Sequence, residues 1–129
     1  MSDLMAFLSA RLDEDEAAAK AATPPPWRAA GEDILSDTDD PHWAGACAAN
    51  ASGADAVHIA RHDPVRVLRE VEAKRNILAR YEDCLARQED QDYPYAPAAE
   101  QAREYEDFVL PNLAASYSGH HDYDEDWTP

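Results

Sequence analysis

Apolar residues near the start of the chain recur at intervals of three and four positions, the spacing that places them on one face of an α-helix. This stretch begins at Ser2, a suitable N-cap. Its apolar side consists of Leu4, Phe7 or Leu8, and Leu12. Prolines at residues 24–26 end it, because proline donates no backbone hydrogen bond and drives the preceding residue out of the helical region. We predict a helix over residues 2–22.

The longest periodic stretch follows Asp63 and Pro64, which suit the N-cap and the first position of a helix. It predicts a helix over residues 64–86, preceded by a short helix over residues 54–61. The apolar positions of the long helix are Val67, Leu68, Val71, Leu78, Tyr81 and Leu85. Its polar side alternates positive and negative charges at a spacing of four, which is typical of a solvent-exposed face.

Residues 98–117 have helical composition, and Pro111 within them predicts a kink or a split. The apolar side of this predicted helix consists of Tyr105, Phe108, Val109 and Leu113. An acidic tail follows over residues 118–129 and contains Tyr123 and Trp127. Two arrangements fit the tail: either these aromatic side chains dock on the core, or the tail is a mobile peptide.

Short apolar groups alternate with turn-forming clusters over residues 27–50, which predicts two or three short strands in an antiparallel meander. Few of these residues are β-branched, so the strands need a helix to cover one face. The predicted fold class is α+β, mainly α, with three principal helices and a small antiparallel β-meander. We expect residues 1–117 to form a single acidic helical domain and residues 118–129 a C-terminal tail.

Charge restricts the classes of function that fit the chain. Its 27 acidic and 11 basic residues give a net charge of −16, which repels nucleic-acid phosphates and anionic lipids. We therefore expect no direct nucleic-acid binding and no membrane association. No apolar run approaches the length that spans a bilayer, and the first residues are acidic, unlike the basic start of a signal peptide. These features predict a cytoplasmic protein.

The charge is distributed unevenly along the chain. Residues 1–60 carry a net charge of −8, residues 61–87 carry +2 and residues 88–129 carry −10. Two interpretations fit this distribution. Either the acidic flanks pack against the basic central helix, or the basic face of that helix binds an acidic partner.

Few residues have a spacing that points to chemistry. His58 and His62 are four positions apart, so a helix places both on one side toward a metal ion, and His120 and Asp122 are able to complete such a site. Hydrogen-bonding histidines are the alternative interpretation. The chain has no glycine-rich phosphate loop, and neither cysteine lies in a motif typical of a nucleophile. We expect no cofactor and a protein that is not an enzyme.

Three further stretches are specific in sequence: the acidic residues 12–16, the run from Asp55 to Arg75, and the C-terminal residues 117–127. Together they resemble DUF6221, a family of small actinobacterial and actinophage proteins of unknown function. Residues 22–27, Ala-Thr-Pro-Pro-Pro-Trp, are similar to a motif of phage early-region proteins of the Ead type. Within the resemblance, the candidate binding residues are Trp27, His58, His62, Arg69, Arg75, His120, Asp122, Tyr123 and Trp127.

Several matching positions also have a purely structural interpretation. Asp63 is predicted to cap the long helix, and Trp27 is predicted to lie in the core. Glu72 is predicted to form a buried ion pair with Arg69 or Arg75. These roles concern stability and imply no ligand.

The leading hypothesis for function is a small non-enzymatic protein that binds an unidentified protein partner, as an accessory or regulatory factor linked to phages or mobile elements. One alternative is an acidic DNA mimic that occupies a nucleic-acid-binding protein. The other is a metal- or ligand-binding domain, or an enzyme, that uses His58, His62, His120 and Asp122. Both a monomer and a homodimer fit the sequence.

Overall fold

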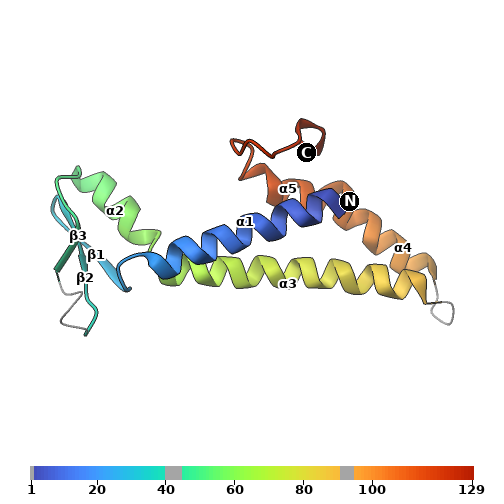
Figure 1. Ribbon diagram of the computed structural model, residues 1–129, viewed down its shortest axis with the longest axis horizontal. Coiled ribbons are helices and arrows are strands. Elements are labelled where there is room, and N and C mark those ends of the chain that lie inside the picture. Colours follow the sequence, from blue (N-terminus) through green and yellow to red (C-terminus); the bar gives the residue numbers. More distant parts are fainter. Residues whose placement is uncertain (1, 40–44, 91–94) are drawn as a thin grey trace. The chain divides into compact units, whose positions relative to one another are not determined.

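The computed structural model describes residues 2–39, 45–90 and 95–129, so residues 40–44 of the predicted meander lie outside it (Figure 1). The elements are α1 (Ser2–Ala21), β1 (Trp27–Ala30), β2 (Asp33–Ser36), β3 (Gly45–Ala48), α2 (Gly53–Arg61), α3 (Pro64–Glu89), α4 (Tyr95–Glu104), a π-helical turn (Tyr105–Val109), α5 (Leu110–Ala115) and a 3-10 turn (Glu125–Trp127). The predicted fold class, α+β and mainly α with an antiparallel meander, is confirmed. The chain divides into two compact units: unit 1 comprises Met1–Asp13 and Glu72–Pro129, and unit 2 comprises Glu14–Val71.

In unit 2, the three strands form an antiparallel sheet in the order β1-β2-β3. The register of β1 and β2 pairs Trp27 with Ser36. Gly31 turns the chain between these strands at φ +63°, a left-handed conformation that favours glycine. Helix α2 packs against β1 and β2 and supplies the cover that short strands need. Ile34 of β2 and Ala56 of α2 are fully buried.

Unit 1 holds most of the large buried side chains. Those in unit 1 are Leu4, Phe7, Leu8, Leu12, Leu78, Tyr81, Cys84 and Leu110. Because Phe7 and Leu8 are both buried, both belong to the apolar side of α1. Side-chain hydrogen bonds between described residues join α3 to the helices that follow it. The hydroxyl of Tyr81 donates to Glu106 over 2.7 Å, and the thiol of Cys84 donates to Gln101 over 3.5 Å.

The last predicted helix begins earlier than expected and changes pitch in its middle. Helix α4 passes through the π-helical turn into α5, just before Pro111. In this turn the N–H of Leu110 donates to the carbonyl of Tyr105, five residues back. Because a π turn contains more residues than an α turn, the buried face departs from the regular helical spacing. The prediction that Phe108 lies on the apolar side is therefore wrong: the residue is 62% exposed.

Helix α3 has the exposed polar side that its charge pattern predicts, with ion pairs at i,i+4 spacing. The prediction of a buried ion pair for Glu72 is wrong, because Glu72 and Arg69 are both exposed. Arg75 instead contacts Asp13 of α1, with 2.7 Å between their charged atoms. Among the described helices, none combines the length and the apolar character needed to cross a membrane.

Candidate binding surfaces

The C-terminal tail folds onto α1 within unit 1. Phe7 is the centre of this contact, because its ring centroid lies 5.1 Å from that of Trp127 and 6.0 Å from that of Tyr123. Tyr117 and His120 approach the same ring, with centroid distances of 6.3 and 5.8 Å. Tilted and edge-to-face pairs are favourable arrangements of aromatic rings. Of the two arrangements considered for the tail, the structure has the docked one.

Arg11 connects α1 to the turn at the start of the tail. The residue is buried, and its guanidinium carbon lies 5.0 Å from the centroid of the Phe7 ring. One terminal nitrogen donates to Nδ1 of His120 over 2.8 Å and lies 3.7 Å from a carboxylate oxygen of Asp122. The backbone N–H of Asp122 donates to the same Nδ1 over 3.1 Å. The neutral imidazole of His120 therefore accepts at Nδ1 and carries its proton at Nε2.

The same turn brings together a set of possible metal ligands. His120, His121 and Asp122 place one ligand atom each within 4.8 Å of one another. The tautomer of His120 opposes coordination, because Nε2 carries the proton and Nδ1 is already bonded to Arg11. A metal ion at His120 would have to displace Arg11. The other two histidines of the predicted metal set belong to unit 2.

Trp127 lines two hollows of unit 1. The first, the Pro111 hollow, has a volume of about 320 Å³, and its lining includes Leu4, Glu106, Asp107, Pro111, Asp126 and Trp127. The second, the Ala10 hollow, has a volume of about 360 Å³, and its lining includes Asp3, Phe7, Ala10, Arg11, Asp122 and Trp127. One half-buried indole is thus shared by two hollows that both contain carboxylates.

The electrostatic character of these hollows is negative. Unit 1 has sixteen acidic and six basic residues, a net charge of −10. In the core of the same unit, the pKa of Tyr81 is raised above its ordinary value of 10.0. Burial is the largest cause, and the hydrogen bond to Glu106 and the charge of Glu106 add to it. Tyr81 therefore stays a neutral donor to Glu106. Among the described lining residues of both hollows, Arg11 is the one positively charged side chain.

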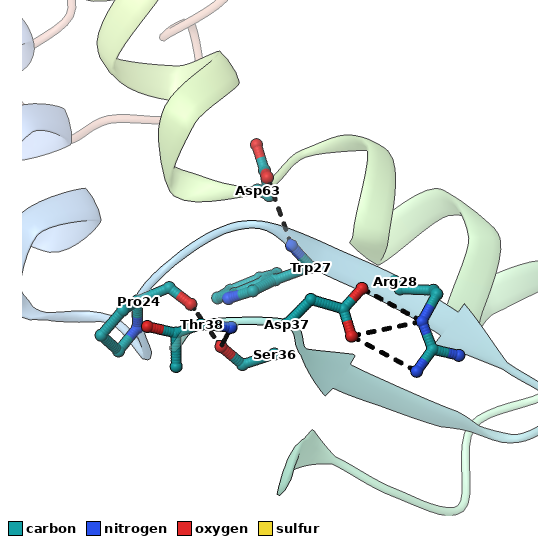
Figure 2. Close-up of polar contacts among 7 residues, drawn as sticks. All are labelled: Pro24, Trp27, Arg28, Ser36, Asp37, Thr38 and Asp63. Atoms are coloured by element: carbon teal, nitrogen blue, oxygen red, sulfur yellow. Dashed lines mark hydrogen bonds and ion pairs between the residues drawn. The ribbon is translucent and has the colours of Figure 1, made fainter. Parts of the chain in front are cut away.

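In unit 2, Trp27 is held at the start of β1 by hydrogen bonds (Figure 2). Its backbone N–H donates to Oδ2 of Asp63 over 3.4 Å. Its indole N–H donates to the carbonyl of Thr23, which the figure does not draw, over 2.8 Å. The other carboxylate oxygen of Asp63 accepts from the backbone N–H of Arg66 over 3.0 Å. This contact confirms Asp63 as the cap of α3. Trp27 itself is half-buried, not fully enclosed in the core.

Figure 2 also shows the polar contacts that hold the proline segment and the hairpin. The hydroxyl of Ser36 donates to the carbonyl of Pro24 over 2.6 Å and accepts from the N–H of Thr38 over 3.4 Å. The Nε of Arg28 in β1 donates over 3.1 Å to a carboxylate oxygen of Asp37, the residue that follows β2. The segment that leads into β1 is thereby fixed to β2.

Trp27 lines a hollow of unit 2, the Trp27 hollow, which has a volume of about 280 Å³. Its lining also includes Asp15, Ala18, Ala19, His62 and Val67. The rings of His58 and His62 have centroids 4.4 Å apart, and Nδ1 of His62 lies 2.7 Å from the carbonyl oxygen of His58. A carbonyl oxygen only accepts, so Nδ1 of His62 carries the proton in this contact.

The candidate binding residues thus divide between the two units. Those in unit 1 are Arg75, His120, Asp122, Tyr123 and Trp127. Those in unit 2 are Trp27, His58, His62 and Arg69. The sequence reasoning missed Phe7 and Arg11 as the residues that hold the tail. The sequence contains one signal for them, a spacing of four positions, which places both on the same face of α1.

Both cysteines are free thiols. Burial raises the pKa of Cys47, whose Sγ donates to the carbonyl of Ile34 over 3.3 Å. Cys84 is fully buried in unit 1. The raised pKa keeps the Cys47 thiol protonated at neutral pH, and a protonated thiol is a poor nucleophile.

Comparison with known proteins supports the family resemblance seen in the sequence. No curated protein and no solved structure matches the chain. A family model described as a family of unknown function matches residues 1–129. Because this match covers every residue of the chain, the protein belongs to the DUF6221 family.

Proposed function

We propose that this protein is a non-enzymatic protein-binding module, and that unit 1 binds a basic segment of its partner. One observation carries the proposal: the half-buried Trp127 lines two hollows that both contain carboxylates. The strongly acidic composition and the resemblance to actinobacterial and actinophage proteins further support a cytoplasmic accessory role linked to phages or mobile elements.

The chemistry of the two hollows favours a partner segment that combines positive charge with apolar groups. An arginine or lysine side chain gains from the face of an indole ring and from paired carboxylates. Leu4 and Pro111 line the Pro111 hollow but are themselves buried, so the half-buried indole of Trp127 supplies apolar surface beside these carboxylates. Tryptophan is among the residues that most often dominate binding energy when it lies at the centre of an interface. The net charge of −10 on unit 1 also speeds the approach of a basic partner.

A set of short peptides with equal apolar content tests this proposal, with arginine, serine or glutamate at the remaining positions. Fluorescence anisotropy is expected to detect binding of the arginine peptides alone, with an affinity that falls as salt rises. Trp127→Ala should weaken this binding by about tenfold or more. Asp126→Asn, which removes one charge of the Pro111 hollow, should weaken it by roughly two- to fivefold.

Phe108→Ala is the matched control, because Phe108 is an exposed aromatic residue outside both hollows. This variant should bind the arginine peptides as tightly as the wild type. Equal affinity for arginine and glutamate peptides, or an affinity that Trp127→Ala leaves unchanged, would contradict the proposal.

A further inference from the structure

The carboxylates that line the Pro111 hollow differ in their surroundings. Glu106 is half-buried, whereas Asp107 and Asp126 are exposed. One oxygen of Glu106, Oε1, accepts from the almost completely buried hydroxyl-bearing side chain of Tyr81 over 2.7 Å. The second oxygen, Oε2, has no hydrogen-bond partner among the described residues. Because each carboxylate oxygen is an acceptor, Oε2 remains available to a donor on a ligand.

The position of Glu106 is fixed by the backbone and by its side-chain contact. The residue belongs to the π-helical turn, in which the N–H of Leu110 bonds to the carbonyl of Tyr105. Single π turns within α-helices occur frequently at functional sites. The hydroxyl of Tyr81, on α3, then holds the carboxylate in place. A ligand that binds Glu106 therefore does not have to order this side chain, which saves conformational entropy.

The charge of Glu106 is not neutralised by a cation within the described part of the chain. Its partner Tyr81 is a neutral donor. Neither Asp107 nor Asp126 has an ion-pair partner among the described residues, and no described lysine or arginine lines the Pro111 hollow. A half-buried carboxylate loses part of its hydration, and a cation that bonds to it offsets this loss.

The arrangement of the acceptors favours arginine over lysine. Glu106 and Asp107 come from the π-helical turn, whereas Asp126 and Trp127 come from the 3-10 turn of the tail. A guanidinium directs a planar fork of N–H donors to several acceptors, is weakly hydrated and stacks on aromatic rings. The ammonium of lysine is a compact and strongly hydrated point charge.

We propose that the Pro111 hollow is an arginine pocket, in which Glu106, positioned by Tyr81, selects a guanidinium over an ammonium. This inference rests on the proposed function, because it names the side chain of the basic partner segment that enters the hollow. Glu106 would be the residue that determines specificity, and Tyr81 would act through Glu106 as a positioning residue.

Three peptides with one apolar sequence test this selection, with arginine, lysine or citrulline at a single position. Citrulline has nearly the shape of arginine but no charge. Fluorescence anisotropy at constant salt should show the arginine peptide binding at least about fivefold more tightly than the lysine peptide. It should bind at least about tenfold more tightly than the citrulline peptide.

Three variants assign the selection to Glu106. Glu106→Gln should lower the affinity for the arginine peptide by about tenfold and remove most of the preference over lysine. Tyr81→Phe should reduce the same preference by roughly two- to threefold, because the carboxylate loses its fixed position. Glu104→Gln is the matched control, since Glu104 is exposed and lines neither hollow of unit 1. It should weaken both basic peptides equally, by less than about twofold.

The outcomes separate this inference from the proposed function. Equal binding of the arginine and lysine peptides, with both still weakened by Trp127→Ala, would overturn the arginine pocket and leave the proposed function standing. A preference for arginine that persists in Glu106→Gln would overturn the role of Glu106, and one that persists in Tyr81→Phe would overturn that of Tyr81. No binding of either basic peptide would contradict both proposals. Circular dichroism of each variant confirms that a loss of binding is not a loss of fold.

Discussion

The contacts that stabilise the interior of unit 1 differ from those that stabilise the interior of unit 2. Unit 1 buries large apolar side chains at helical spacing, such as Leu8 and Leu12 of α1 and Leu78 of α3. Among the described residues, the buried apolar side chains of unit 2 are fewer and mostly smaller: Ala19, Ile34, Ala56, Pro64 and Val71. Its short strands depend on directional contacts, such as the hydrogen bond from Ser36 to the carbonyl of Pro24.

The tryptophans of the two candidate binding surfaces are held in place by the same two kinds of contact. Trp127 of unit 1 is supported by packing on Phe7, which is itself buried. Trp27 of unit 2 is positioned by hydrogen bonds, which fix orientation while each adds only about 1 kcal/mol of stability. We therefore expect unit 1 to be most sensitive to loss of an apolar side chain and unit 2 to loss of a polar contact.

The largest predicted effect is that of a cavity in unit 1. Leu8→Ala should lower the free energy of unfolding by about 2–5 kcal/mol, because Leu8 is almost completely buried. Ile34→Val removes a single methylene group from the core of unit 2 and should cost about 0.5–1.5 kcal/mol. Urea unfolding followed by circular dichroism measures both. A cost below about 2 kcal/mol for Leu8→Ala would contradict the expectation that unit 1 depends on its large buried side chains.

Asp63 tests the polar contacts of unit 2. Asp63→Ala removes the cap of α3 and the contact to the backbone of Trp27, so it should cost about 1–2 kcal/mol in urea unfolding. Asp63→Asn is the matched control for the cap, because asparagine caps helices nearly as well as aspartate, while its single amide oxygen accepts from Arg66 and no longer from Trp27. We expect the asparagine variant to retain most of the stability. Equal losses in both variants would show that the contact to Trp27 or the negative charge, and not the cap, is what matters.

Tyr81 tests a polar contact of unit 1. Tyr81→Phe should cost about 1 kcal/mol at pH 8, because it removes the hydrogen bond to Glu106. The pKa of Tyr81 is raised in the folded protein, so the unfolded chain loses this proton first as pH increases. The wild type should therefore lose stability relative to Tyr81→Phe above about pH 10, by up to about 1.4 kcal/mol per pH unit.

Urea unfolding of both proteins between pH 8 and pH 11 measures this dependence. The difference in stability between wild type and Tyr81→Phe should shrink across the alkaline part of the series and then change sign. Two profiles that stay parallel over the whole range would contradict the assigned environment of Tyr81.

The smallest predicted effect belongs to an exposed ion pair of unit 1. Arg75 and Asp13 lie 2.7 Å apart, but their side chains are 41% and 73% exposed. Exposed pairs contribute little, so Arg75→Ala should change the free energy of unfolding by less than about 0.5 kcal/mol. A loss above about 1 kcal/mol in urea unfolding would contradict the expectation that exposed ion pairs contribute little to the stability of unit 1.

The elements with regular apolar spacing could be predicted from the sequence. Helices α1, α2 and α3 lie within three residues of their predicted ends, because caps and prolines mark where they begin and end. The π-helical turn could not be predicted, since no residue type signals it. That turn is the physical reason why Phe108 was placed on the wrong face.

The candidate surfaces were predictable only in part. The sequence indicates Trp27, His62 and Trp127 as unusual residues, but it does not indicate what each of them contacts. Arg11 and His120 are 109 positions apart, and a contact over such a separation depends on tertiary packing that no local pattern encodes. The tautomers of the histidines follow from their hydrogen-bond partners and are equally invisible in the sequence.

The most direct test of the proposed function is to observe the three indole N–H signals while an arginine-rich apolar peptide is added to the full chain. Heteronuclear NMR should show the largest change at Trp127, and a peptide with glutamates in place of the arginines should produce none. The largest change at Trp27 or Trp43, or equal changes with both peptides, would contradict the assignment of Trp127 as the centre of the binding surface.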